Sequence, residues 1–170
     1  MVIKNDFVET PKEITKLLLN NEKFEGNILE PCCGNGAISE ILKKEGYKVI
    51  SSDLNEYGYG EIKDVFDIKE EYDNIITNPP FSIKLAIPIQ RYLFSKTKKK
   101  LVLLWFLKNV GQMLEGKSIE GLKYVYIIGK VNWIETKLGW KFAWYVWEKG
   151  YKGDVMIKNL NSQNKPEASS

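Results

Sequence analysis

Apolar residues along this chain fall into short groups, and the spacing within each group indicates the element that it forms. Ile14, Leu17 and Leu18 share one face of a helix that begins near Thr10, where Thr10-Pro11-Lys12-Glu13 has the form of a capping box. Residues 101–107 have no polar face, which is typical of a strand buried on both sides. The same reasoning predicts further helices over residues 37–45, 83–95 and 110–114, and strands over residues 27–30, 47–52, 61–63, 74–77, 124–129 and 142–147.

Strands alternate with helices over the first two-thirds of the chain, which predicts an α/β fold with a mostly parallel sheet. Ligands of such sheets bind at the carboxyl ends of the strands. Glu30, Asp53, Asp64 and Asn78 all lie at or just beyond predicted strand ends, so we expect a functional site there. Pro88 lies inside the helix predicted over residues 83–95, which should therefore kink or begin late.

The length of 170 residues suffices for one domain, which we expect over residues 1–160. Residues 161–170 are polar and are expected to form a disordered tail. Apolar residues make up 44% of the chain, enough for a sizeable core. The 25 Lys and Arg residues against 22 Asp and Glu residues give a net charge of +3, which permits a nucleic-acid partner without requiring one.

Missing residue types exclude several chemistries. The chain has no histidine, which excludes Ser–His–Asp and Cys–His catalysis and histidine-ligated metals. Cys32 and Cys33 are adjacent, which disfavours a disulfide, and two cysteines are too few for structural zinc, so we expect no metal. The N-terminus lacks a signal-peptide pattern, and no apolar run approaches the roughly 20 residues of a membrane helix. We therefore expect a cytoplasmic protein, prokaryotic or viral, that does not contact membranes.

Gly34-Asn35-Gly36 lies between a predicted strand and a predicted helix, where glycine permits a tight turn and a closely bound ligand. Asp53 ends the next strand, where an acid can accept hydrogen bonds from ribose hydroxyls. A dinucleotide motif would have a third glycine where Ser39 stands. The segment Glu30-Pro31-Cys32-Cys33-Gly34-Asn35-Gly36 instead resembles the first S-adenosylmethionine (SAM) motif of adenine methyltransferases. Its cysteines are expected to be small packing residues.

Asn78-Pro79-Pro80-Phe81 follows a predicted strand and suits chemistry on an amino group. The amino group of a nucleobase is a poor nucleophile because its lone pair is delocalised into the ring. The Asn78 side-chain oxygen and the Pro79 carbonyl can accept its two hydrogens while positive charge develops. Consecutive prolines stiffen the direction of that carbonyl, and Phe81 offers a face on which the base can stack.

Together these segments resemble the SAM-dependent, adenine-specific DNA methyltransferase family, and the resemblance covers about residues 5 to 150. It implies a Rossmann-like fold with a seven-stranded, mostly parallel sheet, one antiparallel strand and helices on both faces. It also implies SAM as cofactor, S-adenosylhomocysteine as product, DNA as partner, and Asn78, Pro79, Pro80 and Phe81 as catalytic residues. The base would stack between Phe81 and Trp133. The implied SAM-binding residues are Phe7, Thr10, Pro11, Glu30, Pro31, Cys32, Gly34, Gly36, Asp53, Leu54, Asp64, Val65 and Asn78.

Most of these assignments have a purely structural alternative. Thr10 and Pro11 could serve only to begin a helix, Trp133 could be a core residue, and Asp67 could replace Asp64.

Family members with this motif order have a separate target-recognition domain, so a partner could supply recognition. RNA or a protein glutamine could be the acceptor, and the chain could be a SAM-binding or nucleic-acid-binding subunit without turnover. Lys96, Lys98, Lys99 and Lys100 are expected in a loop, either solvated or in contact with phosphates.

Overall fold

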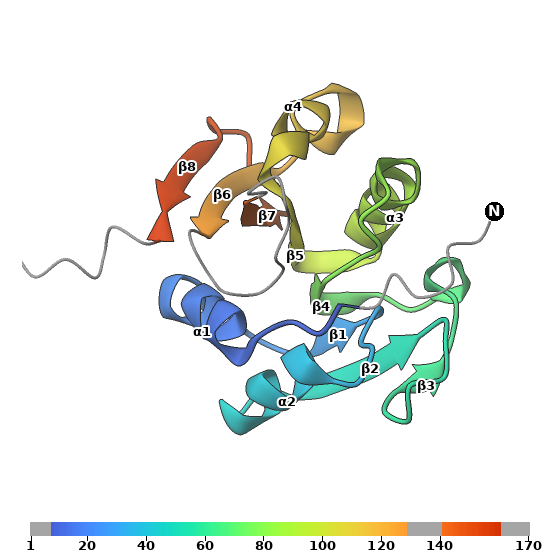
Figure 1. Cartoon of the computed structure of the whole chain (residues 1–170). Coiled ribbons are helices and arrows are strands. Elements are labelled where there is room, and N and C mark those ends of the chain that lie inside the picture. The colour runs from blue at the N-terminus through green and yellow to red at the C-terminus, as the bar shows by residue number, and fades with distance from the viewer. Residues whose placement is uncertain (1–7, 129–140, 161–170) are drawn as a thin grey trace, which may run out of the picture.

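The computed structural model describes residues 8–128 and 141–160, which contain eight strands in one sheet. Figure 1 shows these elements in chain order. They are α1 (Lys12–Asn21), β1 (Ile28–Glu30), α2 (Ala37–Lys44), β2 (Val49–Asp53), β3 (Glu61–Ile62), η1 (Val65–Asp67), β4 (Tyr72–Thr77), α3 (Ile83–Ser95), β5 (Thr97–Phe106), η2 (Leu107–Asn109), α4 (Val110–Met113), η3 (Gly116–Ser118), β6 (Leu122–Ile128), β7 (Phe142–Glu148) and β8 (Met156–Asn159).

The strand order is β3-β2-β1-β4-β5-β7-β6-β8. Strand β7 is antiparallel to both of its neighbours, and every other pair of neighbours is parallel. The predicted α/β class, the mostly parallel sheet and the antiparallel strand near the C-terminus are therefore confirmed. The sheet has one strand more than expected, because the short edge strand β8 exposes all four of its residues and lacks an apolar alternation.

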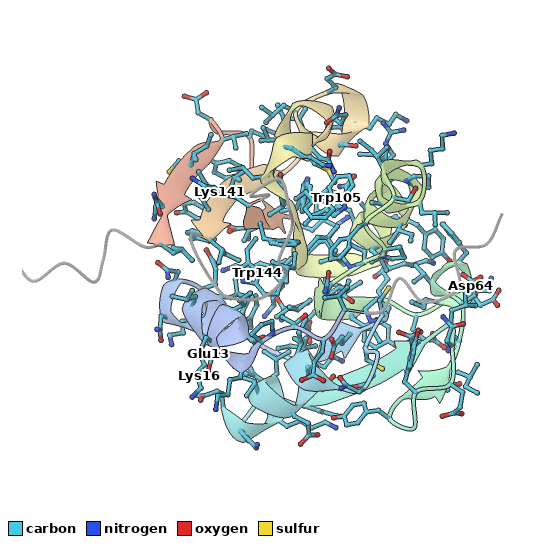
Figure 2. All side chains as sticks on the ribbon, viewed as in Figure 1. Glu13, Lys16, Asp64, Trp105, Lys141 and Trp144 are labelled. Carbon is cyan, nitrogen blue, oxygen red and sulfur yellow. The ribbon has the colours of Figure 1, made fainter. Side chains whose placement is uncertain are left out.

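Helices cover both faces of the sheet, with α1 and α2 on one side and α3 and α4 on the other (Figure 1). Strand β7, which was predicted over residues 142–147, is buried along those residues, and none of them is polar enough to define a solvent-facing side. Figure 2 shows Trp144 on the α1 side of the sheet and Trp105 on the side of α3 and α4. The Trp144 indole donates a hydrogen bond to the Ile14 carbonyl at 3.0 Å, and the Trp105 indole donates to the Phe81 carbonyl at 3.3 Å.

Helix α1 begins at Lys12, and its first turn differs from the predicted capping box. Pro11 is the N-cap, and no side chain caps the helix. Thr10 is buried and lies within hydrogen-bond distance of Asn78, so its hydroxyl serves a residue far away in the sequence. The predicted apolar face is present, since Ile14 and Leu18 are fully buried.

The predicted basic loop at Lys96–Lys100 is mostly strand, because β5 begins within it. Two of its lysines reach acidic partners, with Lys99 3.2 Å from Glu25 and Lys100 2.6 Å from Glu22. Long lysine side chains can run along the sheet and place only their charged ends at its margin. These lysines lie at the amino ends of the parallel strands, at the edge opposite to the one where β4 ends.

Helix α3 was predicted to kink or to begin late, and it begins five residues before Pro88, so the late start does not occur. A proline at this position removes one backbone donor, whose acceptor would be the Lys84 carbonyl. Lys84 and Pro88 are both exposed, so water can satisfy the carbonyl that loses its partner.

Candidate active site

Polar side chains gather where three neighbouring parallel strands end. Glu30, Asp53 and Thr77 are the last residues of β1, β2 and β4, and Asn78 follows directly. The segment between β1 and α2, residues 31–36, is called the glycine loop here. It crosses this edge of the sheet, as expected from its position between a strand and a helix.

Hydrogen bonds join the glycine loop to the strands on both sides of β1. The Asp53 carboxylate accepts a bond from the Gly34 backbone N–H at 2.9 Å and a second from the Asn55 N–H at 2.9 Å. On the other side, the Cys32 N–H donates to the Thr77 hydroxyl at 3.2 Å. The loop is therefore fixed between the acid at the end of β2 and the residue before Asn78.

The Glu30 carboxyl is buried beneath the glycine loop. It accepts a hydrogen bond from the Ser39 hydroxyl of α2, and this hydroxyl also lies 2.6 Å from the Ser51 hydroxyl of β2. Burial, with a smaller contribution from the negative charge of Asp53, raises the pKa of Glu30 to about 8. The group is therefore mostly protonated at neutral pH unless a positive charge is placed beside it.

The two cysteines have the character of packing residues. Burial raises the pKa of Cys33 to about 11 and the pKa of Cys32 further still, so both thiols stay protonated at neutral pH. Cys33 also packs so closely against Gly60 that a Cβ at Gly60 would lie 2.7 Å from its sulfur. A protonated, confined thiol is a poor nucleophile, which agrees with the role expected from the sequence.

Asn78 is held by the segment that precedes α1. Its side-chain nitrogen Nδ2 donates to the Val8 carbonyl at 3.3 Å and to the Thr10 hydroxyl at 3.2 Å. Its side-chain oxygen Oδ1 is buried and has no hydrogen-bond partner among the described residues. Buried acceptors are usually satisfied, so this oxygen is available to a donor brought by a ligand.

Phe81 lies in an aromatic cluster with Phe106 at the end of β5 and Phe142 at the start of β7. The Phe81 ring centroid lies 4.7 Å from that of Phe106 and 5.7 Å from that of Phe142. Phe81 itself is only partly buried, at the margin of the core. Phe106 and Phe142 lie in two predicted strands that are distant in the sequence, and only the pairing of β5 with β7 brings them together beside Phe81.

Asp64 and Val65 lie beyond β3, next to the end of β2. The Lys63 N–H donates to the Asp53 carbonyl at 2.8 Å, which brings this segment beside Asp53. The Asp64 carboxylate accepts a bond from the Phe66 N–H and so caps the short η1 turn, while Val65 is buried. Leu54 is 60% exposed at the same edge, an apolar surface that a flat ring could cover.

Comparison with solved structures gives this arrangement a context. Magnesium protoporphyrin IX methyltransferase (ChlM) from Synechocystis, solved with bound SAM, matches with a TM-score of 0.62 and 14% identity over 82% of this chain and 79% of that chain. The chain has the fold of SAM-dependent methyltransferases. A candidate RNA methyltransferase from Pyrococcus horikoshii matches with a TM-score of 0.66 and 20% identity, over 84% of this chain and 82% of the other.

A type I restriction-modification methyltransferase subunit from Streptococcus thermophilus has the same methyltransferase fold. It matches with a TM-score of 0.65 and 14% identity, over 94% of this chain and 49% of that chain. No family model matches the sequence, and no curated protein matches it either.

Within this methyltransferase fold, the structure brings together many of the residues singled out from the sequence. Contacts connect Thr10, Asn78, the glycine loop and Asp53 in one network. Phe7 and Trp133, which were expected to contact SAM and the base, lie outside the described residues. The sequence did not identify Val8, Thr77 and Tyr59 as residues of the site. Val8 contributes a backbone carbonyl, Thr77 a hydroxyl that contacts a distant residue, and Tyr59 a ring that packs against Gly36.

Within residues 8–128 and 141–160, no group of three or more Cys, Asp and Glu side chains is placed to hold a metal ion. No helix of that part of the chain is long and apolar enough to cross a bilayer.

Proposed function

We propose that the protein is a SAM-dependent methyltransferase that transfers a methyl group to the exocyclic amino nitrogen of adenine in DNA. The observation that carries the proposal is the unpartnered, buried Oδ1 of Asn78 at the end of β4. In the motif Asn78-Pro79-Pro80-Phe81, this oxygen and the Pro79 carbonyl would accept the two hydrogens of the amino group.

The residues around the glycine loop suit SAM. Glu30 is a buried carboxyl whose pKa is raised to about 8, and it forms no ion pair within the described residues. The ammonium of the methionine part would stabilise its charged form. Asp53 would accept hydrogen bonds from the ribose, and Leu54, Asp64 and Val65 would surround the adenine of the cofactor. Bound SAM supplies an electrophilic methyl group on a sulfonium. If its ammonium approaches Glu30, the pKa of Glu30 falls and binding near pH 7 releases a proton.

The chain's own groups prepare the acceptor for attack. As the amino nitrogen becomes tetrahedral, Asn78 and Pro79 hold its hydrogens and direct its lone pair toward the methyl carbon. The new N–C bond replaces the C–S bond, S-adenosylhomocysteine leaves, and one amino proton passes to water. No histidine base is needed before transfer, in agreement with the composition.

The aromatic surroundings of Phe81 favour a planar acceptor. Phe81 is only partly buried, and its ring, supported by Phe106 and Phe142, would offer a stiff stacking face. Stacking on such faces contributes about 1–3 kcal/mol per base. A glutamine amide would gain less from that face than a purine would. We therefore propose adenine and not a protein amide as the methyl acceptor. We propose DNA and not RNA because the Thr10-Pro11 segment resembles that of the DNA adenine methyltransferases.

A specificity partner is part of the proposal. Two structures with this fold are named as methyltransferase or modification subunits of type I restriction systems, and this chain spans about half the length of each. Between β5 and β6 the described chain has only short helical turns, a small surface from which to read a base sequence. We infer that another protein contributes most of the sequence recognition.

The test is methyl transfer from labelled SAM to unmethylated DNA, RNA and a protein extract, measured side by side for the wild type and Asn78→Ala. Label in DNA adenine that is lost in the variant supports the proposal. Label in RNA or protein alone rejects DNA adenine as the acceptor and retains the chemistry of Asn78.

SAM binding is measured separately by titration calorimetry in two buffers of different ionisation enthalpy. Proton release near pH 7 that disappears in Glu30→Gln supports the contact between Glu30 and the cofactor. SAM binding without transfer to any acceptor, with and without a cell extract to supply a partner, rejects the enzymatic proposal in favour of a binding subunit.

A further inference from the structure

The side chain of Asn78 has two hydrogens on Nδ2, and residues before α1 provide an acceptor for each. The Val8 carbonyl lies 3.3 Å from Nδ2 and the Thr10 hydroxyl lies 3.2 Å from it. Thr10 is buried and is not used as a helix cap. The two contacts span 70 and 68 residues of sequence, so the fold and not local geometry brings them together.

These contacts decide which end of the Asn78 amide faces the amino group that receives the methyl. A backbone carbonyl only accepts hydrogen bonds, so Val8 requires the amide to present its nitrogen on that side. With Thr10 taking the second hydrogen, no donor of Asn78 is left to point elsewhere. The remaining atom, Oδ1, is the one found buried without a partner.

We propose that Thr10 is a positioning residue for the acceptor amino group: the Val8 carbonyl selects the orientation of the Asn78 amide, and the Thr10 hydroxyl holds the amide in that orientation by accepting its second hydrogen, which leaves Oδ1 for the substrate. The inference rests on the proposed function and adds a role for Thr10 distinct from the SAM contact expected from the sequence. An amide that turned by half a rotation would present N–H groups to an amino group that is itself a donor. The site would then repel the acceptor and leave Oδ1 against the Val8 carbonyl.

The chain offers matched variants for the test. Thr10→Val keeps the shape of the side chain and removes the hydroxyl, while Thr10→Ser restores it. Thr15→Val is the control, because Thr15 is a buried threonine of α1 whose hydroxyl has no partner among the described residues. Asn78→Ala tests the proposed function itself in the same series.

Steady-state transfer to unmethylated DNA is measured for each variant, with SAM affinity measured by calorimetry. Thr10→Val is expected to lower kcat about tenfold with the Kd for SAM unchanged within twofold. Thr10→Ser is expected to recover most of the rate, and Thr15→Val to match the wild type. An unchanged kcat in Thr10→Val, or a weaker SAM affinity with an unchanged kcat at saturating SAM, overturns the inference.

A second readout does not require turnover. The side-chain amide protons of Asn78, assigned by their absence in Asn78→Ala, are followed by hydrogen exchange in an NMR experiment on the free protein. Exchange about tenfold faster in Thr10→Val and restored in Thr10→Ser supports the fixed amide, and equal exchange in all variants contradicts it. If Asn78→Ala keeps full activity, the proposed function fails; if Asn78→Ala is inactive and Thr10→Val has wild-type kcat, only the role of Thr10 fails.

Discussion

The ring of Tyr59 occupies the space that a Cβ on Gly36 would need. A Cβ built at Gly36 lies 2.5 Å from two carbons of that ring, and Gly36 has a positive φ of 86°. The Tyr59 hydroxyl in turn donates to Glu40 and accepts a bond from Lys43 at 2.7 Å, which fixes the ring against α2. Glycine is therefore required at position 36 for two independent reasons, and neither involves a ligand.

Gly36→Ala is expected to lower the free energy of unfolding more than Gly46→Ala does. Both positions have φ near 90°, but nothing lies within 4 Å of a Cβ at Gly46, so that variant measures backbone strain alone, about 1–2 kcal/mol. The clash with Tyr59 adds roughly 1–3 kcal/mol at Gly36. Urea unfolding measures both, and in the Tyr59→Ala background the loss caused by Gly36→Ala should fall to that caused by Gly46→Ala. Equal losses for the two single variants would contradict this account.

Glu30 should make the stability of the free protein depend on pH. Its pKa is about 8 in the folded chain and 4.5 when exposed, so between these values the folded state holds more protons than the unfolded state. The stabilisation is complete below pH 4.5 and is lost as the pH rises toward 8, by up to about 1.4 kcal/mol per pH unit. Glu30→Gln, measured by urea unfolding from pH 5 to 9, should flatten this dependence. Glu13→Gln, an exposed residue of α1 (Figure 2), should leave it in place.

Phe81→Leu should weaken use of the acceptor and leave SAM binding intact. Leucine keeps apolar contacts with Phe106 and Phe142 but removes the flat face, so we expect kcat/KM for DNA to fall by about tenfold or more. Phe94→Leu is the matched control, since Phe94 is partly buried near the end of α3 at the opposite edge of the sheet. A similar loss of kcat/KM in both variants would mean that the effect is general and not due to stacking.

The free energy of unfolding should fall when the buried Glu22 carboxylate loses either of its two hydrogen-bond donors. It accepts bonds from the Tyr126 hydroxyl at 2.5 Å and from the Lys100 ammonium at 2.6 Å. Tyr126→Phe removes a neutral donor and should cost about 1–2 kcal/mol of unfolding free energy. Lys100→Met removes the only ion-pair partner recorded for Glu22 in the described residues and should cost more, about 2–3 kcal/mol. Thermal and urea unfolding would measure both, and the reverse order would contradict the ion pair.

Hydrophobic patterning was sufficient for most of the sheet and the three longer helices. Strands β5 and β7 were predictable because an unbroken apolar run has to be buried on both faces. The edge strand β8 was not predictable, because its four residues are exposed and its pairing with β6 depends on where the sheet ends. The lysines at the start of β5 concealed a strand, since their carboxylate partners lie more than 70 residues away.

The candidate site was predictable where its chemistry is concentrated in short motifs. Asn78 and the glycine loop were identified from adjacent residues, and the structure joins them through Cys32 and Thr77. The role of Thr10 was not predictable in the same way. A threonine before a proline suggests a helix cap, and only the packing of the N-terminal segment against β4 shows that its hydroxyl reaches Asn78.

The hydrogen bond from the Trp105 indole to the Phe81 carbonyl makes Trp105 an intrinsic fluorescence probe of the candidate site. The Trp105 indole is buried and donates to the backbone of Phe81, so a displacement of the segment at residues 78–81 changes the polarity around its ring. Once the other four of the five tryptophans are replaced by phenylalanine, emission from Trp105 would therefore follow the arrival of an acceptor at Phe81, with no label attached to the protein or to the substrate.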